Sequence, residues 1–521
     1  MSHWSPPPLD RQQAALFYPT LEDSLPADHP VRLLDEILDT IDWTAWETQY
    51  HGRLGQPPIH PRVLAAVILY GLTVGLRSSR QVERACGNAL DFIWLSSGRQ
   101  MDHSTLCEFR VKFSGPLKDL FRQVGRLAMS MGLVRLNQVG LDGTRVRANS
   151  SRHATASAAT LEARLAALDG EVERLMSEAE VADRQDEMLY GETTPNALPA
   201  ELRDVARRQE RLRAALAAAQ ATDARRAARG EGVKAAAKVP VADPESAVLP
   251  NKEGGHAPNY SPLAAVDGER GFIVSAEIVD SESGATVAVV DGIAQDLGAC
   301  PVAVLADSAH GTGVNLTALA ARGIAAYIPP VGEVTAATNP AARADLQQPV
   351  AERDWAALPV NPQSKKLDKS AFIYDREKDC YWCPQGRRLN YRDRSTAERE
   401  GGLVAYRKYQ CGDCDGCPLG GRCLGSGAKS RTVSRDEHEP AREAMRERLK
   451  TEAGRTMYGR RRWLCETPFA VLKSRLGLRL FLLRGQAKVA TEWRWACAAF
   501  NLVKLAREVR RMRVKFAAEL A

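Results

Sequence analysis

An apolar run that ends on an acid is the most constraining feature of this sequence. CPVAVLADSAH (residues 300–310) is apolar up to Asp307. A strand without a polar face has to be covered on both faces, as parallel strands of α/β proteins are. Before it, LAAVDGERGFIVSAEIV reads as two strands around Asp267-Gly268, and after it GVNLTALAARG and IAAYIPP read as a helix and a strand. The sequence therefore predicts an α/β core.

Two further acids stand in comparable places. In LNQVGLDGTRV, Asp142 comes where a short apolar strand ends, and Glu466 lies in a helical stretch near the C-terminus. At helical spacing, Arg462 and Lys473 can point to the same side of this helix as Glu466. Tyr458 lies about two turns before Glu466, on roughly the same side. Carboxylates at strand ends are typical holders of hard cations such as Mg²⁺. Taken singly, each Asp could only cap a strand or helix, and Glu466 could only form ion pairs within its helix.

The N-terminal 130 residues read as short helices joined by Gly-bearing turns, which suits a helix-turn-helix-like module. Within them, Asp102, His103 or Ser104 could cap a helix. After residue 152, two helical stretches keep an apolar seam, and they predict an antiparallel hairpin whose turn is YGETTPNALP. The seam residues are Leu161, Leu165, Leu168, Val172, Leu175, Leu202, Val205, Leu212 and Leu216. The stretch that follows, to about residue 262, reads as a linker.

Positive charge is concentrated at the C-terminal end. Residues 440–521 hold 20 Lys and Arg against 7 Asp and Glu, a balance of +13, whereas the remaining chain sums to −6. This end could be a solvated helical face or a surface that binds a polyanion such as DNA. No apolar stretch reaches 18 residues and no signal peptide is visible, so we expect a cytoplasmic protein with no membrane span.

Six of the eleven cysteines cluster, as Cys380-x2-Cys383 and, later, Cys411-x2-Cys414-x2-Cys417-x5-Cys423. Without a secretion signal, such pairs are more often metal ligands than disulfides, and four thiolates around a structural Zn²⁺ are the leading interpretation. Our choice of ligands is Cys383, Cys411, Cys414 and Cys417. An iron-sulfur cluster and free thiols remain alternatives. The other five lie in apolar surroundings and are expected in cores: Cys86, Cys107, Cys300, Cys465 and Cys497.

Several of these segments together resemble a known family. In order, they are LDGTRVRAN, NYSPLAAVDGERGFIVSAEIVD, VLADSAHGTGVNLTALAARGIAAYIPP and YGRRRWLCETPFAVLKSRLGLRLFLLRGQAKVATEWRWACAAFNLVKL. They resemble a DDE transposase of a bacterial insertion sequence, of the IS1182-like type within the IS4/IS5-like assembly. The segment HPRVLAAVILYGLTVGLRSSRQVERACGNALDFIWLSSGRQMDHSTLCEFR is similar to the helical domain that precedes the catalytic domain there.

The resemblance implies a ribonuclease-H-like core in which Asp142, Asp307 and Glu466 are catalytic and hold two Mg²⁺ or Mn²⁺ ions. Tyr458, Arg462 and Lys473 resemble the signature around the third acid. Arg462 and Lys473 would hold the DNA backbone near the scissile bond. The implied partners are the element's terminal inverted repeats, target DNA and a second copy in a homodimer, and the implied location is the nucleoid.

The expected organisation has six parts. They are a helical DNA-binding or dimerisation domain (1–130), the first core strands (131–152), a hairpin insertion with linker (153–250), the catalytic core (251–335), a Cys-rich insertion (336–440), and catalytic helices with a basic tail (441–521).

Two positions depart from the family pattern. Three residues separate Tyr458 from Arg462 where two are usual, and residues 308–310 read Ser-Ala-His in place of a small residue, Gly and an aromatic. Two rival functions stay open, a stand-alone metal-dependent nuclease of the same fold and a decayed or domesticated DNA-binding protein that does not cut. The presence of all three acids argues against decay.

Overall fold

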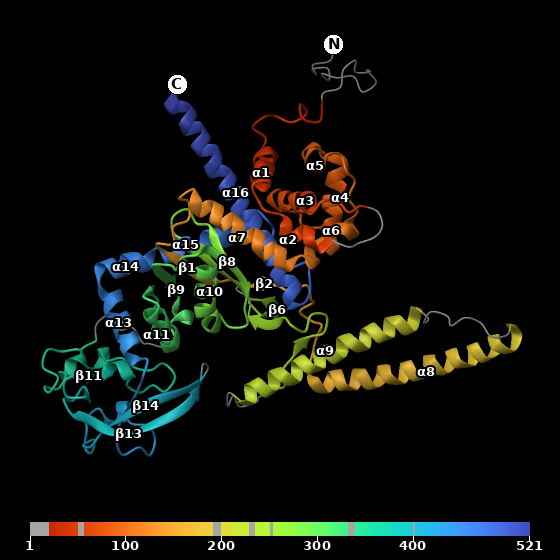
Figure 1. Ribbon diagram of the computed structural model, residues 1–521. Coiled ribbons are helices and arrows are strands. Elements are labelled where there is room, and N and C mark those ends of the chain that lie inside the picture. The colour runs from red at the N-terminus through yellow and green to blue at the C-terminus, as the bar shows by residue number, and fades with distance from the viewer. Residues whose placement is uncertain are drawn as a thin grey trace, which may run out of the picture.

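The computed structural model of the protein describes residues 20–50, 57–190, 200–228, 235–250, 254–331, 339–399 and 402–520. It combines an N-terminal group of helices, a mixed β-sheet, a long pair of helices, a second sheet and a C-terminal set of helices (Figure 1). The predicted α/β character is therefore confirmed. Among the described residues, no helix has the length and apolar character that a membrane span requires.

The central sheet holds the strand-like runs read from the sequence. Its strands, in spatial order, are β10 (Ala325–Tyr327), β9 (Ala303–Ala306), β1 (Val139–Gly143), β7 (Pro262–Asp267) and β8 (Ile273–Ile278). The first three are parallel, and β7 and β8 are antiparallel to their neighbours. Every residue of β7 and β9 is buried, as expected for apolar runs covered on both faces. The predicted hairpin at Asp267 joins β7 to β8, where Gly271 has a φ of +70°.

Helices flank these strands. Helix α10 (Glu282–Leu297) connects β8 to β9, and α11 (Gly313–Ala321) connects β9 to β10. Near the C-terminus come α13 (Glu439–Lys450), α14 (Glu452–Gly459), α15 (Arg461–Ser474) and α16 (Gln486–Leu520). Helix α15 packs on β1 and β7, and α14 packs on β9 and β10. The strands of the sheet are therefore covered by helices that lie far from them in the sequence.

The N-terminal part is helical, as predicted. Its helices are α1 (Pro30–Asp39), α2 (Thr44–Glu47), α3 (Pro61–Thr73), α4 (Ser79–Asn88), α5 (Leu90–Leu95), α6 (His103–Lys112) and α7 (Ser114–Ser130), with η1 (Thr48–Tyr50) after α2. Asp102 caps α6 by accepting from the backbone N–H of Ser104 at 2.7 Å. Helix α3 is buried on nearly all sides.

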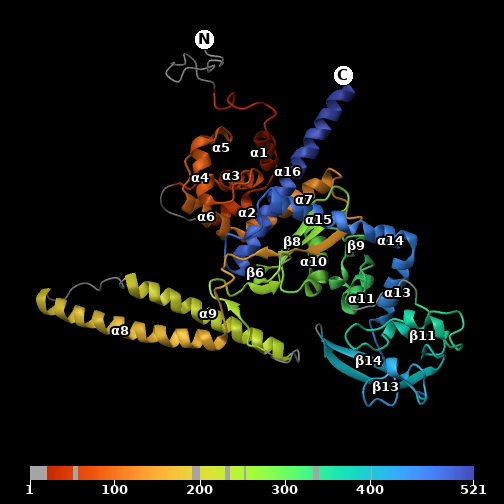
Figure 2. The same ribbon diagram turned by 180° about the vertical axis from the view of Figure 1, so that it is seen from behind.

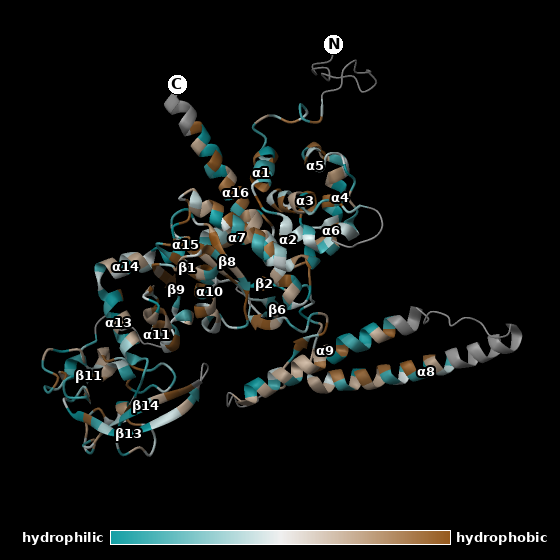
Figure 3. Ribbon diagram, viewed as in Figure 1, coloured by the Kyte–Doolittle hydropathy of each residue, from teal (hydrophilic) through white to brown (hydrophobic). Residues whose placement is uncertain are grey.

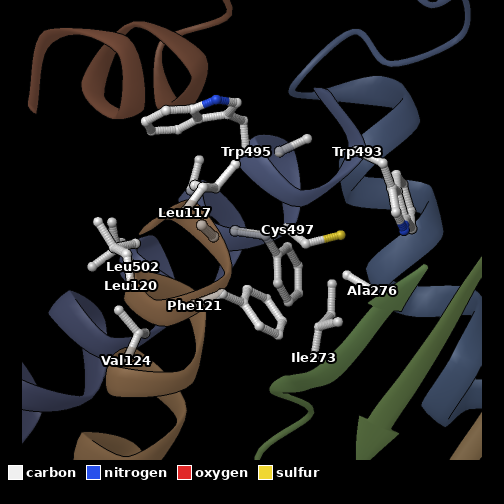
Figure 4. Packing of buried hydrophobic residues seen from close by; sticks show 14 of the residues in the cluster. Leu117, Leu120, Phe121, Val124, Ile273, Ala276, Trp493, Trp495, Cys497 and Leu502 are labelled. Carbon is white, nitrogen blue, oxygen red and sulfur yellow. The ribbon is translucent and has the colours of Figure 1, made fainter. Parts of the chain in front are cut away.

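Helix α16 joins the N-terminal helices to the sheet. It packs against α1, α3, α6, α7 and β8. Figure 4 shows residues of α7, β8 and α16 meeting in one apolar cluster, among them Phe121, Ile273 and Trp493. A half-buried ion pair, Arg77–Glu492 at 2.7 Å, adds a polar contact between the same parts. Part of the C-terminal positive charge is used within the molecule, since Arg494 also pairs with Glu277 at 3.2 Å.

The predicted hairpin is formed by α8 (Ala158–Tyr190) and α9 (Ala200–Ala228), which lie side by side and extend away from the sheet (Figures 1 and 2). The amide of Gln220 bonds Glu162 at 3.5 Å and that of Gln209 bonds Asp169, so the two helices are antiparallel. Their apolar seam includes Leu161, Leu165 and Leu212, whereas hydrophilic residues are spread along α9 (Figure 3). Except for Tyr190, the turn predicted at residues 190–199 lies outside the described residues.

The linker expected after the hairpin is wrong in part. This stretch contains β4 (Val239–Pro240), β5 (Ala247–Pro250) and β6 (His256–Tyr260). Strand β4 pairs with β3 (Thr155–Ala156), and β5 and β6 form a small sheet with β2 (Val146–Arg147). The buried carboxylate of Asp243 fixes the stretch, because it accepts from Tyr260 Oη at 2.7 Å and from the N–H of Gly485 at 3.0 Å. These segments belong to the folded core.

The Cys-rich region has its own sheet and its own apolar cluster. The strands, in spatial and sequence order, are β11 (Ile373–Asp375), β12 (Cys380–Trp382), β13 (Arg388–Arg399), β14 (Gly402–Cys411) and β15 (Thr432–Asp436), all antiparallel. Short helical turns, η3 (Glu352–Ala357), η4 (Lys369–Ala371) and α12 (Gly420–Cys423), complete it. In Figure 1 this region lies beside α13, at the side of the central sheet away from the N-terminal helices.

Candidate active site

The ends of two neighbouring parallel strands place Asp142 and Asp307 side by side. Leu141 of β1 is in register with Ala306 of β9, so the residue that follows on each strand is one of these acids. Asp307 begins the short turn η2 (Ser308–His310), where its Oδ1 accepts from the N–H of Ala309 at 2.9 Å. The sequence placed both acids where their strands run out, and the pairing of β1 with β9 brings the two ends together.

Helix α15 carries Glu466 over the same face of the sheet. Gly140, two residues before Asp142 and on the same face, allows a close approach, since a Cβ atom there would lie 2.8 Å from Cys465 Sγ. Ala303 and Leu305 of β9 pack with Cys465 and its neighbour Leu464. The Glu466 side chain is 64% exposed and lies 3.6 Å from Arg462 Nε at its Oε1. The third acid therefore stands on the solvent side of this face.

The acids influence one another electrostatically. Burial, assisted by the negative charges of Asp307 and Glu466 and opposed by Arg461, raises the pKa of Asp142 to about 6. Arg461 Nη1 lies 3.8 Å from Asp142 Oδ2. A buried carboxylate with further acids and only one close cation beside it marks a place where additional positive charge is favoured.

Two residues that sequence reasoning missed reach this place. Glu282 begins α10, and burial, followed by the charges of Asp307 and Asp142, raises its pKa. His310 is completely buried, and burial lowers its pKa to about 4. The ligand atoms of Glu282, Asp307 and His310 all lie within 4.8 Å of one another. No sequence pattern distinguishes Glu282, because an acid in the first turn of a helix is expected for electrostatic reasons alone.

The donor set fits a divalent ion. It consists mainly of carboxylate oxygens, which hard cations prefer, and it includes a buried nitrogen, His310 Nε2, that has no hydrogen-bond partner among the described residues. The residues that could hold metal ions here are thus Asp142, Asp307, Glu466, Glu282 and His310.

The signature residues around Glu466 are only partly arranged as expected. Arg462 and Lys473 lie on α15 with Glu466, and the Arg462 side chain is 82% exposed. Lys473 donates to Arg145 O at 3.0 Å and to Thr144 Oγ1, so it ties α15 to the segment after β1. The expected continuous helix from Tyr458 to Glu466 is wrong, because α14 ends at Gly459 and α15 begins at Arg461. Helical spacing therefore does not place Tyr458 on the same side as Glu466.

The clustered cysteines form a second candidate site. A small cavity of the Cys-rich region is lined by five of them, Cys383, Cys411, Cys414, Cys417 and Cys423. The N–H of Arg387 donates to Cys383 Sγ at 3.3 Å, and all the cysteines are free of disulfides. Burial raises the pKa of Cys383, and it raises that of Cys411 to about 12.

The predicted ligand set is a subset of this group, and Cys423 is the member that sequence reasoning left out. Cys380 lies elsewhere on β12, near Arg388 and Asp375. Among the isolated cysteines, Cys86, Cys465 and Cys497 are buried as expected, but Cys107 and Cys300 are exposed, so their expected core positions are wrong. Cys107 lies on the exposed side of α6, and Cys300 lies in the exposed turn before β9.

Two family models match the chain. Residues 382–506 match a transposase DDE domain, and residues 19–112 match the transposase domain DUF772. The first match includes the cysteine cluster, α15 with Glu466 and most of α16, and the second covers most of the N-terminal helices. Asp142 and Asp307 lie between the two matched segments. None of the curated proteins compared with the chain matches it.

The matches define the class: the chain is a DNA transposase, an enzyme that cleaves DNA and transfers its strands with the help of divalent metal ions. It is a DDE transposase of the IS1182-like type, as the sequence resemblance indicates.

Proposed function

We propose that the chain acts through a two-metal DDE centre built on a ribonuclease-H-like core, with Asp142, Asp307 and Glu466 as the three acids. The observation that carries this proposal is the parallel register of β1 and β9, which sets the first two acids side by side under α15. The sheet order β10-β9-β1-β7-β8, with an antiparallel hairpin on one side of β1 and parallel strands on the other, supports the assignment of the core.

When bound, divalent ions supply Lewis-acid activation of the attacking oxygen and stabilisation of the leaving oxygen in an in-line displacement at phosphorus. Asp142 would hold the ions together with its neighbour Asp307 on the sheet and with Glu466, whose charge acts on Asp142 from α15. Arg462, exposed beside Glu466, supplies a bidentate donor for a DNA phosphate. Lys473 holds α15 to the end of β1 and so keeps Glu466 over the two aspartates.

The substrates we propose are the terminal inverted repeats of the element and a target DNA, bound by a homodimer. The N-terminal helices are the candidate DNA-binding or dimerisation part, and the basic C-terminal helices are the candidate backbone-binding part. Both parts meet along α16, so DNA contacts on either would be held in fixed relation to the acids.

We propose further that the cysteine cavity holds one structural Zn²⁺ that takes no part in catalysis. A zinc site with four thiolate ligands has no open position for substrate. Five sulfurs line the cavity, so Cys423 joins Cys383, Cys411, Cys414 and Cys417 as a possible ligand. The N–H of Arg387 directed at Cys383 Sγ is a contact that favours a thiolate there.

The test of the function uses DNA that carries the flanks of the open reading frame. The wild-type protein with Mg²⁺ or Mn²⁺ should cleave at the element ends. Glu466→Gln should abolish cleavage and leave end binding nearly intact, because glutamine keeps the size of the side chain and removes only the charge. The matched control is Glu447→Gln, an acid on α13 that is 71% exposed and pairs with Lys450, and it should cleave normally.

The rivals predict other outcomes. A stand-alone nuclease would cut without preference for the ends, and a decayed copy would bind the ends without cutting in any metal. Arg462→Ala should weaken end binding and lower the salt slope by about 1, as expected for one lost phosphate contact. Undiminished cleavage by Glu466→Gln would contradict the role given to that acid.

A further inference from the structure

Glu282 and His310 have no part in the three-acid scheme, although both reach its centre. Their ligand atoms and that of Asp307 lie within 4.8 Å of one another. Ligands on opposite sides of an octahedral Mg²⁺ are separated by about 4.2 Å, twice the usual metal–oxygen distance. Neighbouring ligands are about 3 Å apart by the same geometry, so three side chains whose ligand atoms lie this close could share one cation after small adjustments.

The side chain of His310 provides independent evidence that a cation binds here. Its side chain is 0% exposed, and Nε2 has no hydrogen-bond partner among the described residues. The carboxylate oxygen Glu282 Oε2 lies 3.8 Å away, which is too far for a hydrogen bond. A buried polar atom in a native structure normally has a partner, so this nitrogen, directed at two carboxylates, indicates a bound group that it contacts.

The other ring nitrogen fixes the tautomer. His310 Nδ1 lies 2.8 Å from Thr286 Oγ1, and that hydroxyl donates its single proton to Glu282 O at 3.1 Å. With the hydroxyl proton used there, Nδ1 carries the ring proton and donates to Thr286. Asn315 Nδ2 also donates to Thr286 Oγ1, at 3.1 Å. The neutral imidazole then presents an unprotonated Nε2, the form in which histidine binds metals.

A missing side chain on β1 lets Glu282 arrive from the other face of the sheet. Gly140 faces α15, whereas Gly143, three residues later, faces α10. A Cβ atom at Gly143 would overlap Glu282 Oε1. The carboxylate thus passes over the glycine to the strand end where Asp142 and Asp307 lie.

We propose that Glu282 and His310 complete, with Asp307, one of the two divalent-ion positions, and that His310 Nε2 makes this position favour Mn²⁺ over Mg²⁺. Mg²⁺ is a hard cation that takes oxygen ligands, whereas imidazole suits first-row transition-metal ions better. The inference rests on the proposed DDE centre and adds to it a fourth carboxylate and a nitrogen ligand.

The first experiment needs no variant. Full-length protein without DNA is loaded with less than one equivalent of Mn²⁺, and pulsed electron paramagnetic resonance is used to look for coupling of the bound ion to a ¹⁴N nucleus. We expect imidazole nitrogen coupling in the wild type and its loss in His310→Phe, which keeps the ring volume. Bound Mn²⁺ with no nitrogen coupling in the wild type would overturn the proposal.

The second experiment measures Mn²⁺ and Mg²⁺ affinities by titration calorimetry. His310→Phe should weaken Mn²⁺ binding at least tenfold and Mg²⁺ binding much less, and Glu282→Gln should weaken both. Gly143→Ala should resemble Glu282→Gln, because the added methyl group displaces that carboxylate. The matched control is Glu269→Gln, an exposed acid at the opposite end of β7, which should bind both ions as the wild type does.

The outcomes separate this inference from the proposed function. If Asp142→Asn and Asp307→Asn lose metal binding and cleavage while Glu282→Gln and His310→Phe keep the wild-type Mn²⁺ affinity, the DDE centre stands and the additional ligands are refuted. If the aspartate variants keep both metal binding and cleavage, the DDE centre itself is refuted. Circular dichroism of each variant shows whether a loss of binding comes from unfolding.

Discussion

Glu439, the first residue of α13, is expected to hold the Cys-rich region to the catalytic part of the protein. Its side chain is only 3% exposed and contacts three cations, Lys369 Nζ at 2.5 Å, Arg442 Nη2 at 2.8 Å and Arg446 Nη2 at 2.6 Å. Lys369 belongs to the Cys-rich region, whereas the two arginines lie on α13, which packs against α11 and β10. Glu439→Gln keeps the shape of the side chain and removes the charge that the cations share.

The size of the effect follows from the pKa of Glu439. Burial alone would raise it, but Lys369 and Arg442 outweigh burial and lower the pKa from 4.5 to about 2. A shift of this size corresponds to about 3 kcal/mol of stabilisation of the folded contact. Removing the charge should therefore increase the local opening of this junction about a hundredfold.

Hydrogen exchange measured by mass spectrometry gives the local opening directly. At pH 7, peptides that span η4 and the start of α13 should exchange about a hundredfold faster in Glu439→Gln, while peptides of the central sheet stay unchanged. Glu447→Gln, on the exposed side of the same helix, is the matched control and should leave exchange as in the wild type. Equal exchange in wild type and Glu439→Gln would refute the reasoning.

The same ion contact has a defined pH dependence. Because the folded-state pKa of Glu439 is lowered, its stabilisation is complete above about pH 4.5 and is lost as the pH falls towards about 2. Opening of the junction, corrected for intrinsic exchange rates, should rise over that window in the wild type. In Glu439→Gln, it should lack this component.

Three other changes have outcomes that the structure predicts. Gly311→Ala should lower the melting temperature, because the added Cβ would overlap Pro329 O. Gly292→Ala in α10, where no atom lies within 4 Å of the added Cβ, should raise the stability by about 0.5–1 kcal/mol. Thermal melts of the two variants test both expectations. Purified protein should contain one zinc per chain by elemental analysis, and its removal by a chelator should expose the cluster thiols to titration with a thiol reagent; a metal-free preparation with unreactive thiols would contradict the zinc site. Deletion of residues 160–225 with a short Gly/Ser linker should leave a folded, metal-binding core, and an insoluble or unfolded product would show that the hairpin is part of the core.

The central sheet could be read from the sequence because its strands are continuous apolar runs. Strands β9 and β7 lack the alternation of polar and apolar residues that is typical of strands with one face in solvent. Gly323 marks the end of the helical segment that precedes β10. Strands β5 and β6 were missed for the opposite reason. They are short, contain Pro and polar residues, and are held by pairing with each other and with β2, which local pattern cannot reveal.

At the candidate site, the sequence indicated the acids but not their surroundings. Asp142 and Asp307 carried a local signal, the end of an apolar strand. Glu282 carried none, because its place depends on the space above Gly143, which exists only once α10 has packed on the sheet. Tyr458 was assigned to the helix of Glu466 because the break after Gly459 was not read, although glycine is typical of helix ends.

The order of the elements along the chain, in which α16 follows all the other described elements, has a consequence for biosynthesis. Strand β1 is made early, but it lies between β7 and β9, so the ribosome must add more than 160 residues before the sheet can be completed around it. The N-terminal helices wait longer, because α16, which packs against α1, α3, α6 and α7, is made after every other described element. An incomplete chain would therefore expose the apolar surface that α16 covers, and a ribosome that stops early would release a product suited to degradation.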